Sequence, residues 1–142
     1  MACSARAPLV LVVDDDVATT LLIQGILSSR GFQVVCAFDV AGATTVIEER
    51  HPDLILLDVN LPDGNGLDLC RKLKAEPGTA QTPVLFISAN EELPAKIKGF
   101  NAGAADYISK PFAGEEVVAR VSTHLRLKQA YEALAEFHAA RI

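Results

Sequence analysis

The fold of this chain is decided by one stretch, Asp53-Leu54-Ile55-Leu56-Leu57-Asp58-Val59-Asn60-Leu61-Pro62-Asp63-Gly64-Asn65-Gly66. Four apolar residues in succession are closed by a carboxylate and then by Pro and Gly. This pattern is typical of a strand buried on both faces, as strands are in parallel sheets covered by helices. In such sheets, ligands bind just beyond the carboxyl ends of the strands. Asp58 stands at that end, where it could be a nucleophile, a metal ligand or a helix cap.

Four further runs of strand length surround this stretch, and helical patterns separate them. The strands are expected near residues 9–13, 33–36, 83–87 and 107–108, and the helices near 19–29, 40–50, 67–77, 92–102 and from Ala113 onward. This alternation predicts an α/β fold, a doubly wound five-stranded parallel sheet of flavodoxin-like order 2-1-3-4-5. Asp16 is expected to cap the first helix. The fourth helix has only a weak apolar face, formed by Leu93, Ile97 and Phe100.

Composition limits the classes of function. The 142 residues are enough for one domain, and no apolar run approaches the ~20 residues of a membrane span. The first eight residues lack the apolar core of an export signal, so a cytoplasmic protein is expected. A net charge of −5 without a basic cluster argues against direct nucleic-acid binding. Cys3, Cys36 and Cys70 form no C-x-x-C pair and are expected to be reduced, and the scattered histidines predict no zinc site.

Polar side chains follow four of the five predicted strands. They are Asp14, Asp15 and Asp16 after the first strand, Asp58 after the third, Ser88 after the fourth and Lys110 after the fifth. In the predicted strand order these groups converge on one cleft. Clustered carboxylates repel one another unless a cation joins them, and Mg²⁺ prefers such oxygen ligands. Lysine and serine can bind phosphate oxygens, and an aspartate can form an acyl phosphate. The sequence therefore predicts a phosphoryl-accepting site.

The same residues lie in motifs that resemble the receiver domain of two-component response regulators, over about residues 8–125. The motifs are Val-Val-Asp14-Asp15-Asp16, Leu-Leu-Asp58-Val-Asn-Leu-Pro62-Asp-Gly-Asn-Gly66, Phe-Ile-Ser88-Ala89 and Ala-Gly-Ala-Ala-Asp-Tyr107-Ile-Ser-Lys110-Pro111-Phe112. Each motif alone is a weak signal, but four in this order and spacing are a strong one. The resemblance implies a phosphorylation-dependent signalling switch with magnesium-dependent autodephosphorylation rather than an ordinary enzyme.

The resemblance also implies the partners and the metal ligands. Asp58 would receive its phosphoryl group from a phosphohistidine on a sensor histidine kinase or a histidine phosphotransfer protein. The ligands of Mg²⁺ (or Mn²⁺) would be Asp15, Asp58 and the backbone carbonyl of Asn60, with Asp14 holding a metal-bound water.

Further roles follow from the same resemblance. Ser88, where the family also often has threonine, and Lys110 would bind the phosphoryl oxygens. Tyr107 would be the aromatic side chain whose rotamer follows the state of Ser88. The Lys110–Pro111 peptide is expected to be cis, and Asn60 and Asn90 would flank the site at positions that tune the phosphate lifetime.

Other interpretations of these residues remain open. A phosphatase of the haloacid dehalogenase type could use Asp14 in its Asp-x-Asp pattern, although Val17 and Ala18 do not continue that motif. A flavodoxin-like nucleotide binder would need a phosphate loop, which the turn at residues 64–66 does not provide. Taken singly, Ser88 could be an ordinary strand-end hydroxyl, Lys110 a surface lysine and Tyr107 a packing residue.

The last predicted helix continues past the expected end of the domain without Gly or Pro. Leu127, Ala130, Leu134 and Phe137 have the spacing of coiled-coil a and d positions, although two heptads are too few to establish a coiled coil. We therefore expect a tail at residues 1–7, a receiver domain at 8–125 and a helical extension at 126–142. The extension would be a linker to an output module or a homodimerisation helix, and the alternative is a helix folded back on its own domain.

Overall fold

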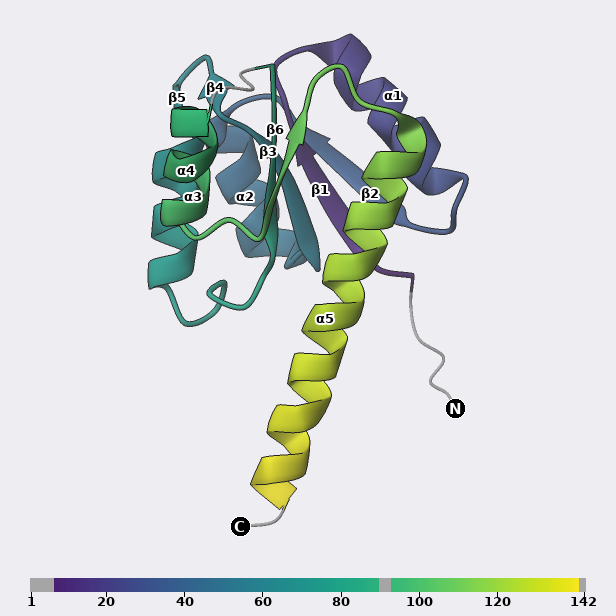
Figure 1. Ribbon diagram of the computed structural model, residues 1–142, viewed down its shortest axis with the longest axis vertical. Coiled ribbons are helices and arrows are strands. Elements are labelled where there is room, and N and C mark those ends of the chain that lie inside the picture. Colours follow the sequence, from purple (N-terminus) through teal and green to yellow (C-terminus); the bar gives the residue numbers. More distant parts are fainter. Residues whose placement is uncertain (1–6, 90–92, 141–142) are drawn as a thin grey trace.

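The computed structural model describes residues 7–89 and 93–140, without the side chains of 93–95 and 138–140. The predictions for Cys3 and Asn90, for the first residue of the expected helix at 92–102, and for residues 1–6 and 141–142 lie outside these ranges. The described chain forms three layers, with a parallel sheet between two layers of helices (Figure 1). This is the α/β architecture that the alternating sequence pattern predicts.

The elements follow one another in the predicted alternation. They are β1 (Leu9–Val13), α1 (Val17–Ser28), β2 (Gln33–Ala37), α2 (Val40–Arg50), β3 (Leu54–Asp58), β4 (Asn60–Leu61), β5 (Gly64–Asn65), α3 (Gly66–Ala75), β6 (Val84–Ser88), α4 (Leu93–Asn101), β7 (Asp106–Ser109) and α5 (Gly114–Ala140). The five-stranded sheet has the order β2-β1-β3-β6-β7, with every neighbouring pair parallel. Because β6 and β7 are its fourth and fifth strands, the predicted order 2-1-3-4-5 is confirmed. The antiparallel pair β4–β5 was expected to be a plain loop.

The strands β1, β3 and β6 are buried at every position because helices cover both faces of the sheet. Figure 1 shows α1 and α5 on one face and α2, α3 and α4 on the other. Alternate residues of each strand enter two separate clusters. One cluster packs against α2 and α3 through side chains such as Ile47 and Leu73, and the other against α1 and α5 through Ile23 and Val121. The two cores hold the carboxyl ends of the strands at one edge of the molecule.

Helix α1 begins and helix α2 ends next to residues that the sequence marks as helix boundaries. Helix α1 begins at Val17, two residues earlier than expected, because the Asp16 side chain accepts a bond from the Ala18 backbone N–H (3.1 Å). The Asp16 cap prediction is therefore confirmed. Helix α2 ends at Arg50, and its C-cap residue, His51, adopts a left-handed conformation (φ 49°) before Pro52.

The predicted apolar face of α4 is wrong at Ile97 and Phe100, while the side chain of Leu93 lies outside the described part of the chain. Ile97 and Phe100 are each 48% exposed, so they point away from the core. The buried positions are instead Gly99 and Ala102. A Cβ atom on Gly99 would come within 3.1 Å of the Phe86 ring, so glycine allows this helix to approach β6 closely. At Gly99, close approach of the backbone brings α4 against the sheet.

Helix α5 continues from Gly114 to Ala140 without interruption, as the absence of Gly and Pro predicts. Its first half packs on the sheet through Val117, Val121 and Leu125, and its second half projects beyond the sheet (Figure 1). None of the helices in the described part of the chain has an apolar stretch long enough to cross a bilayer.

Candidate phosphoacceptor site

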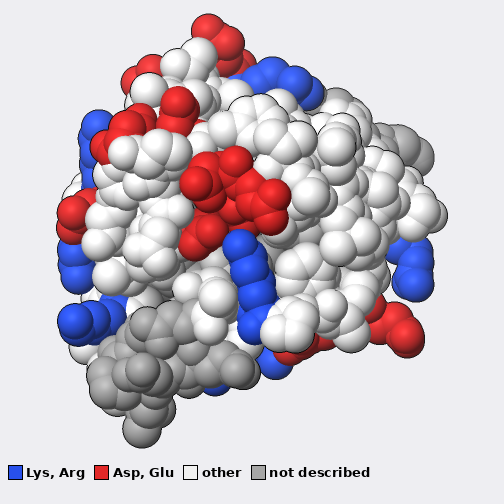
Figure 2. Space-filling model, turned by 90° about the horizontal axis from the view of Figure 1, so that it is seen from above, with Lys and Arg blue, Asp and Glu red and all other residues white. Residues whose placement is uncertain are grey.

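The polar groups that follow β1, β3, β6 and β7 meet at one edge of the sheet. Figure 2, which looks onto this edge, shows acidic side chains gathered at its centre with a basic side chain against them. The cleft here has a volume of about 430 Å³ and is lined by Asp15, Asp58, Asn60, Ser88, Ala89 and Lys110. Five predicted site residues therefore lie around one cavity because their strands are neighbours in the sheet.

Three carboxylates form the acidic part of the site. Asp14, Asp15 and Asp58 each offer an oxygen within 4.8 Å of the others. Asp14 and Asp58 are only 3% and 8% exposed, whereas Asp15 is open to solvent. Burying like charges at this distance is unfavourable unless positive charge compensates them. The set contains only oxygen donors, which suits a hard divalent cation.

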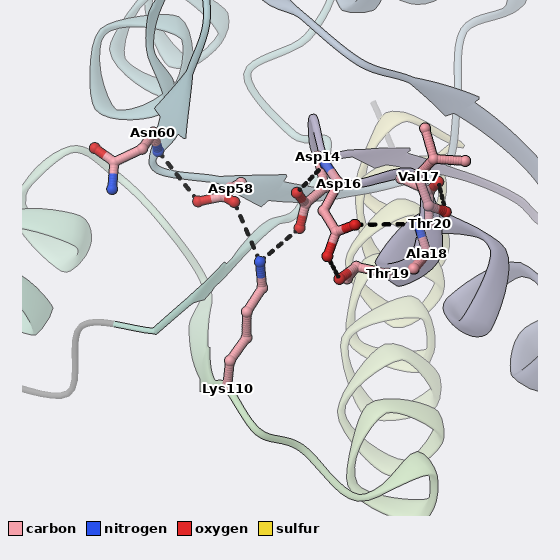
Figure 3. A network of polar contacts seen from close by, with 9 residues as sticks. All are labelled: Asp14, Asp16, Val17, Ala18, Thr19, Thr20, Asp58, Asn60 and Lys110. Atoms are coloured by element: carbon pink, nitrogen blue, oxygen red, sulfur yellow. Dashed lines mark hydrogen bonds and ion pairs between the residues drawn. The ribbon is translucent and has the colours of Figure 1, made fainter.

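Lys110 supplies one compensating charge from the opposite side of the cleft. Its ammonium Nζ lies 2.7 Å from Asp14 Oδ2 and 3.2 Å from Asp58 Oδ2 (Figure 3). Burial disfavours the charged ammonium, but the bonds to Asp14 and Asp58 outweigh burial and raise the pKa of Lys110. Lys110 is therefore not an ordinary surface lysine, since it joins the ends of β1, β3 and β7. The Lys110–Pro111 peptide is cis, as expected.

The pKa of Asp58 depends on a different set of influences from that of Lys110. Burial is the largest influence and raises the pKa of the Asp58 carboxyl above its usual value, and the charge of Asp14 adds to this effect. The Asn60 backbone N–H (3.1 Å from Asp58 Oδ1) and Lys110 act in the opposite direction. In Figure 3 the Asn60 side chain points away from the aspartates, so the backbone is the part of Asn60 that faces them.

Two short-range contacts shape the loops that carry these aspartates. The Asp16 backbone N–H donates to Asp14 Oδ1 (2.9 Å), which orients the Asp14 carboxylate. After β3, the Gly66 N–H donates to the Val59 carbonyl (2.7 Å). A Cβ atom on Gly66 would collide with the Asp58 backbone carbonyl oxygen, so only glycine allows α3 to begin this close to Asp58.

Ser88 and Tyr107 lie at different depths. Ser88 is 2% exposed and lines the cleft at the end of β6. Tyr107 lies outside the cleft lining and is 7% exposed, with its ring centroid 6.4 Å from that of Phe86. Tyr107 therefore packs beside Phe86, and its role as a switch stays a prediction. Cys36 and Cys70, the two cysteines in the described ranges, are free.

Sequence reasoning missed one contributor to the site, the β4–β5 hairpin that follows Asp58. The signal was present, since Pro62-Asp63-Gly64 is a typical turn sequence. Residues 62–66 were predicted as a loop, since strands of only two residues leave no apolar run in the sequence pattern. A separate cavity of about 280 Å³ lies between α2 and α3, and none of the clustered aspartates lines it.

Comparisons with known proteins agree with this geometry. Residues 10–122 match the family described as the response regulator receiver domain. The chain is 40% identical over 117 residues to the DNA-binding response regulator MtrA of Mycobacterium tuberculosis, covering 82% of this chain and 50% of that protein. It is 37% identical over 119 residues to the phosphate regulon transcriptional regulatory protein PhoB of Rhizobium meliloti, covering 84% of this chain and 52% of that protein.

The fold comparison gives the same result. A crystal structure of a putative response regulator from Chloroflexus aurantiacus superposes with a TM-score of 0.82 and 36% identity, covering 84% of this chain and 98% of that chain. This chain spans about half the length of the curated relatives that it matches. These matches give no support to a haloacid-dehalogenase-type phosphatase. The chain belongs to the receiver domain family of two-component response regulators.

Proposed function

We propose that this domain is a phosphorylation-dependent switch in which Asp58 accepts the phosphoryl group of a phosphohistidine. The observation that carries the proposal is the buried Asp58 carboxylate, held between Lys110 and two further carboxylates at an open cleft. In the transfer, an Asp58 oxygen forms a bond to phosphorus while the phosphorus–nitrogen bond of the donor breaks. The electron pair of that bond stays on the imidazole nitrogen. Attack by water on the acyl phosphate would later return the carboxylate and release inorganic phosphate.

The oxygen-only donor set fits Mg²⁺ or Mn²⁺. Asp15, Asp58 and the backbone carbonyl of Asn60 would hold the ion, and Asp14 would hold one of its waters. When bound, the cation offsets the negative charge of the carboxylates and of the phosphoryl oxygens. Lys110 would exchange a carboxylate partner for a phosphoryl oxygen, and Ser88 would donate its hydroxyl to another.

The phosphodonor would contact the rim of the cleft beside α1. The first residue of this helix, Val17, comes three positions after Asp14, and its exposed face carries unusually large apolar side chains. Val17, Leu21 and Leu22 are 55%, 60% and 56% exposed. Exposed apolar side chains on a helix that begins beside the site are the sort of surface that a partner protein covers. We infer that a sensor histidine kinase or a histidine phosphotransfer protein docks here.

The proposed domain boundaries follow from the same reasoning. Residues 8–125 would form the receiver unit, preceded by a short tail at 1–7. Residues 126–142 would connect this unit to an output module or pair with a second copy of the chain. The apolar side chains that project from the second half of α5 support this division.

Incubation with acetyl phosphate and Mg²⁺, followed by intact-mass measurement, tests the acceptor role. A single phosphoryl adduct that maps to Asp58 and is absent from Asp58→Asn is the expected result. Asp15→Ala should form the same adduct only at higher Mg²⁺ concentration, because one direct ligand has been removed. An adduct on Asp14, or steady turnover of phosphate esters, would instead identify a phosphatase.

A second measurement separates docking from chemistry. Leu21→Ser should slow transfer from a phosphohistidine donor protein and leave the rate with acetyl phosphate unchanged. Ile97→Ser, which changes an exposed apolar residue on α4 (48% exposed), is the control and should change neither rate. Equal slowing by both donors would show that α1 affects the site itself rather than the docking of a partner.

A further inference from the structure

The β4–β5 hairpin lies beside the phosphoacceptor, with Leu61 packed against the core and the tip of the hairpin exposed. Residues 62–65 are exposed, and the pairing consists only of Asn60 with Asn65 and Leu61 with Gly64. Two-stranded hairpins of this size are not stable alone. The base of the hairpin is held at Asp58 by the bond from the Gly66 N–H to the Val59 carbonyl. Its tip needs a separate attachment if Asn60 is to keep one position.

That attachment is Asp63. Its carboxylate accepts hydrogen bonds from the backbone N–H groups of Val40 (2.7 Å) and Ala41 (3.1 Å), which open α2. These bonds, the Val40 bond first, hold the pKa of Asp63 below its usual range. At Gly64, a Cβ atom would come within 3.1 Å of Val40 Cγ2, so the hairpin tip lies directly against the helix.

Helix α2 is a firm support for this tip. Its own cap, Asp39, accepts only from the Gly42 N–H (2.7 Å), and its first turn contains no acidic residue. Asp63 therefore supplies acceptors for two N–H groups that helix geometry leaves without partners. The helix itself is anchored by Ala43 and Ile47, which are 0% and 6% exposed in the core.

We propose that Asp63 is a positioning residue for the phosphoacceptor site, since by capping α2 it holds the β4–β5 hairpin, and with it the Asn60 backbone, against Asp58. The inference rests on the proposed function, in which the Asn60 carbonyl is a metal ligand. The Asn60 N–H already donates to Asp58 Oδ1, so displacement of the hairpin disturbs the acceptor carboxylate as well. The hydrogen bond from the Val40 N–H to Asp63 joins the start of α2 to the hairpin turn, 23 residues apart in the sequence.

The test compares Asp63→Ala with Asp39→Ala, which removes the other cap of the same helix without touching the hairpin. Mg²⁺ titration followed by backbone amide chemical shifts gives the affinity of each variant. Asp63→Ala should weaken Mg²⁺ binding by about tenfold, the lower end of the range for residues that orient metal ligands. Asp39→Ala should lower the melting temperature similarly but leave the Mg²⁺ affinity within about twofold of the parent, because the metal ligands keep their orientation.

Hydrogen exchange gives a readout that does not need the metal. In Asp63→Ala the amides of Asn60, Asn65 and Gly66 should exchange faster than in the parent, and in Asp39→Ala they should not. Unchanged Mg²⁺ affinity in Asp63→Ala, or equal weakening in both variants, would overturn the proposal. If the parent itself binds no Mg²⁺, the proposed function fails, and hydrogen exchange alone then decides whether Asp63 holds the hairpin.

Discussion

At the scale of single residues, the site is a balance of unfavourable burial and compensating charge. Asp14 and Asp58 are almost fully buried, and one ammonium, that of Lys110, contacts both of them. Burial raises the pKa of Asp58, which means that its ionised form is unfavourable in the folded state. The protein therefore keeps a destabilising charge at the position where the proposed chemistry needs a nucleophile. Such conflicts between stability and local environment are typical of functional sites.

One consequence can be measured without any phosphodonor. Asp58→Asn should raise the melting temperature in the absence of divalent cations, because it removes a buried charge while Lys110 keeps Asp14 as its partner. A gain of ~1 kcal/mol would correspond to roughly 2–4 °C in a domain of this size. Calorimetry of parent and variant in the presence of a chelator is the measurement. Glu49→Gln, at an exposed position of α2, is the control and should leave the melting temperature unchanged. A melting temperature of Asp58→Asn below that of the parent would contradict the prediction.

At the scale of elements, the start of α3 decides how closely the helix approaches β3. Gly66 is the first residue of α3 and contacts the backbone of Asp58 and Val59, so a side chain there has no room. The clash involves a backbone carbonyl rather than a movable side chain. Relief would require a shift of the loop that carries Asn60.

Gly66→Ala should therefore affect both stability and chemistry. We expect a loss of about 1–3 kcal/mol, as is typical for a residue forced into a packed position, together with slower adduct formation from acetyl phosphate. Gly78→Ala is the matched control because a Cβ atom there meets nothing within 4 Å. Urea unfolding and intact-mass kinetics measure the two effects, and a fully stable, fully reactive Gly66→Ala would show that the loop adjusts freely.

Contacts of the Asp106 side chain also connect β7 to α5. The Asp106 carboxylate accepts from Arg120 through both oxygens (2.9 Å each) and contacts His124 Nε2 at 3.0 Å. Burial alone would raise the pKa of Asp106, but the contacts with His124, the Tyr107 N–H and Arg120 outweigh burial and lower it. Ionised Asp106 therefore stabilises the fold.

The pH dependence of this contribution has a definite sign. Because the folded-state pKa is lowered, the stabilisation is complete above the unfolded value of about 3.9 and is lost as the pH falls through the folded value. Asp106→Ala should cost about 1–3 kcal/mol at neutral pH, and the difference from the parent should shrink below roughly pH 4. Denaturant unfolding from pH 7 to 3 measures it. The control is Glu116→Ala, which removes the more exposed partner of Arg120 and should lower the stability less. If the difference in stability between Asp106→Ala and the parent does not depend on pH, Asp106 ionisation is not its cause.

At the scale of the whole molecule, the second half of α5 exposes several large apolar side chains. Leu127, Tyr131, Leu134 and Phe137 are 54–60% exposed on a helix that leaves the sheet. At its base, Lys128 Nζ lies 3.8 Å from Asp53 Oδ1, which connects the helix to the start of β3. Four large apolar side chains at helical spacing can be buried by a second copy of the same helix.

We predict that this extension mediates dimerisation and that phosphorylation changes its strength. Sedimentation of the full chain and of a chain ending at Leu125, each with and without a beryllofluoride phosphoryl mimic, is the measurement. The full chain should dimerise in at least one state, and the shortened chain should stay monomeric. Leu134→Lys should weaken the dimer, whereas Lys98→Ala on α4 should not. Monomers under all four conditions would leave the extension as a linker.

The sequence by itself determined the architecture and the chemical groups of the site. Apolar runs closed by polar residues predict buried parallel strands, since only residues covered on both faces can be continuously apolar, and the strand order brings Asp15, Asp58, Ser88 and Lys110 to one edge. Only the tertiary structure decided what depends on contacts between distant segments. In the folded protein the Lys110 ammonium contacts Asp14 as well as Asp58. Ile97 and Phe100 of α4 point outward because Gly99 fits against Phe86. The hairpin is attached to α2 through the hydrogen bonds of Asp63. Periodicity describes each helix or strand alone, whereas these contacts are set by how closely two backbones approach after the sheet has formed.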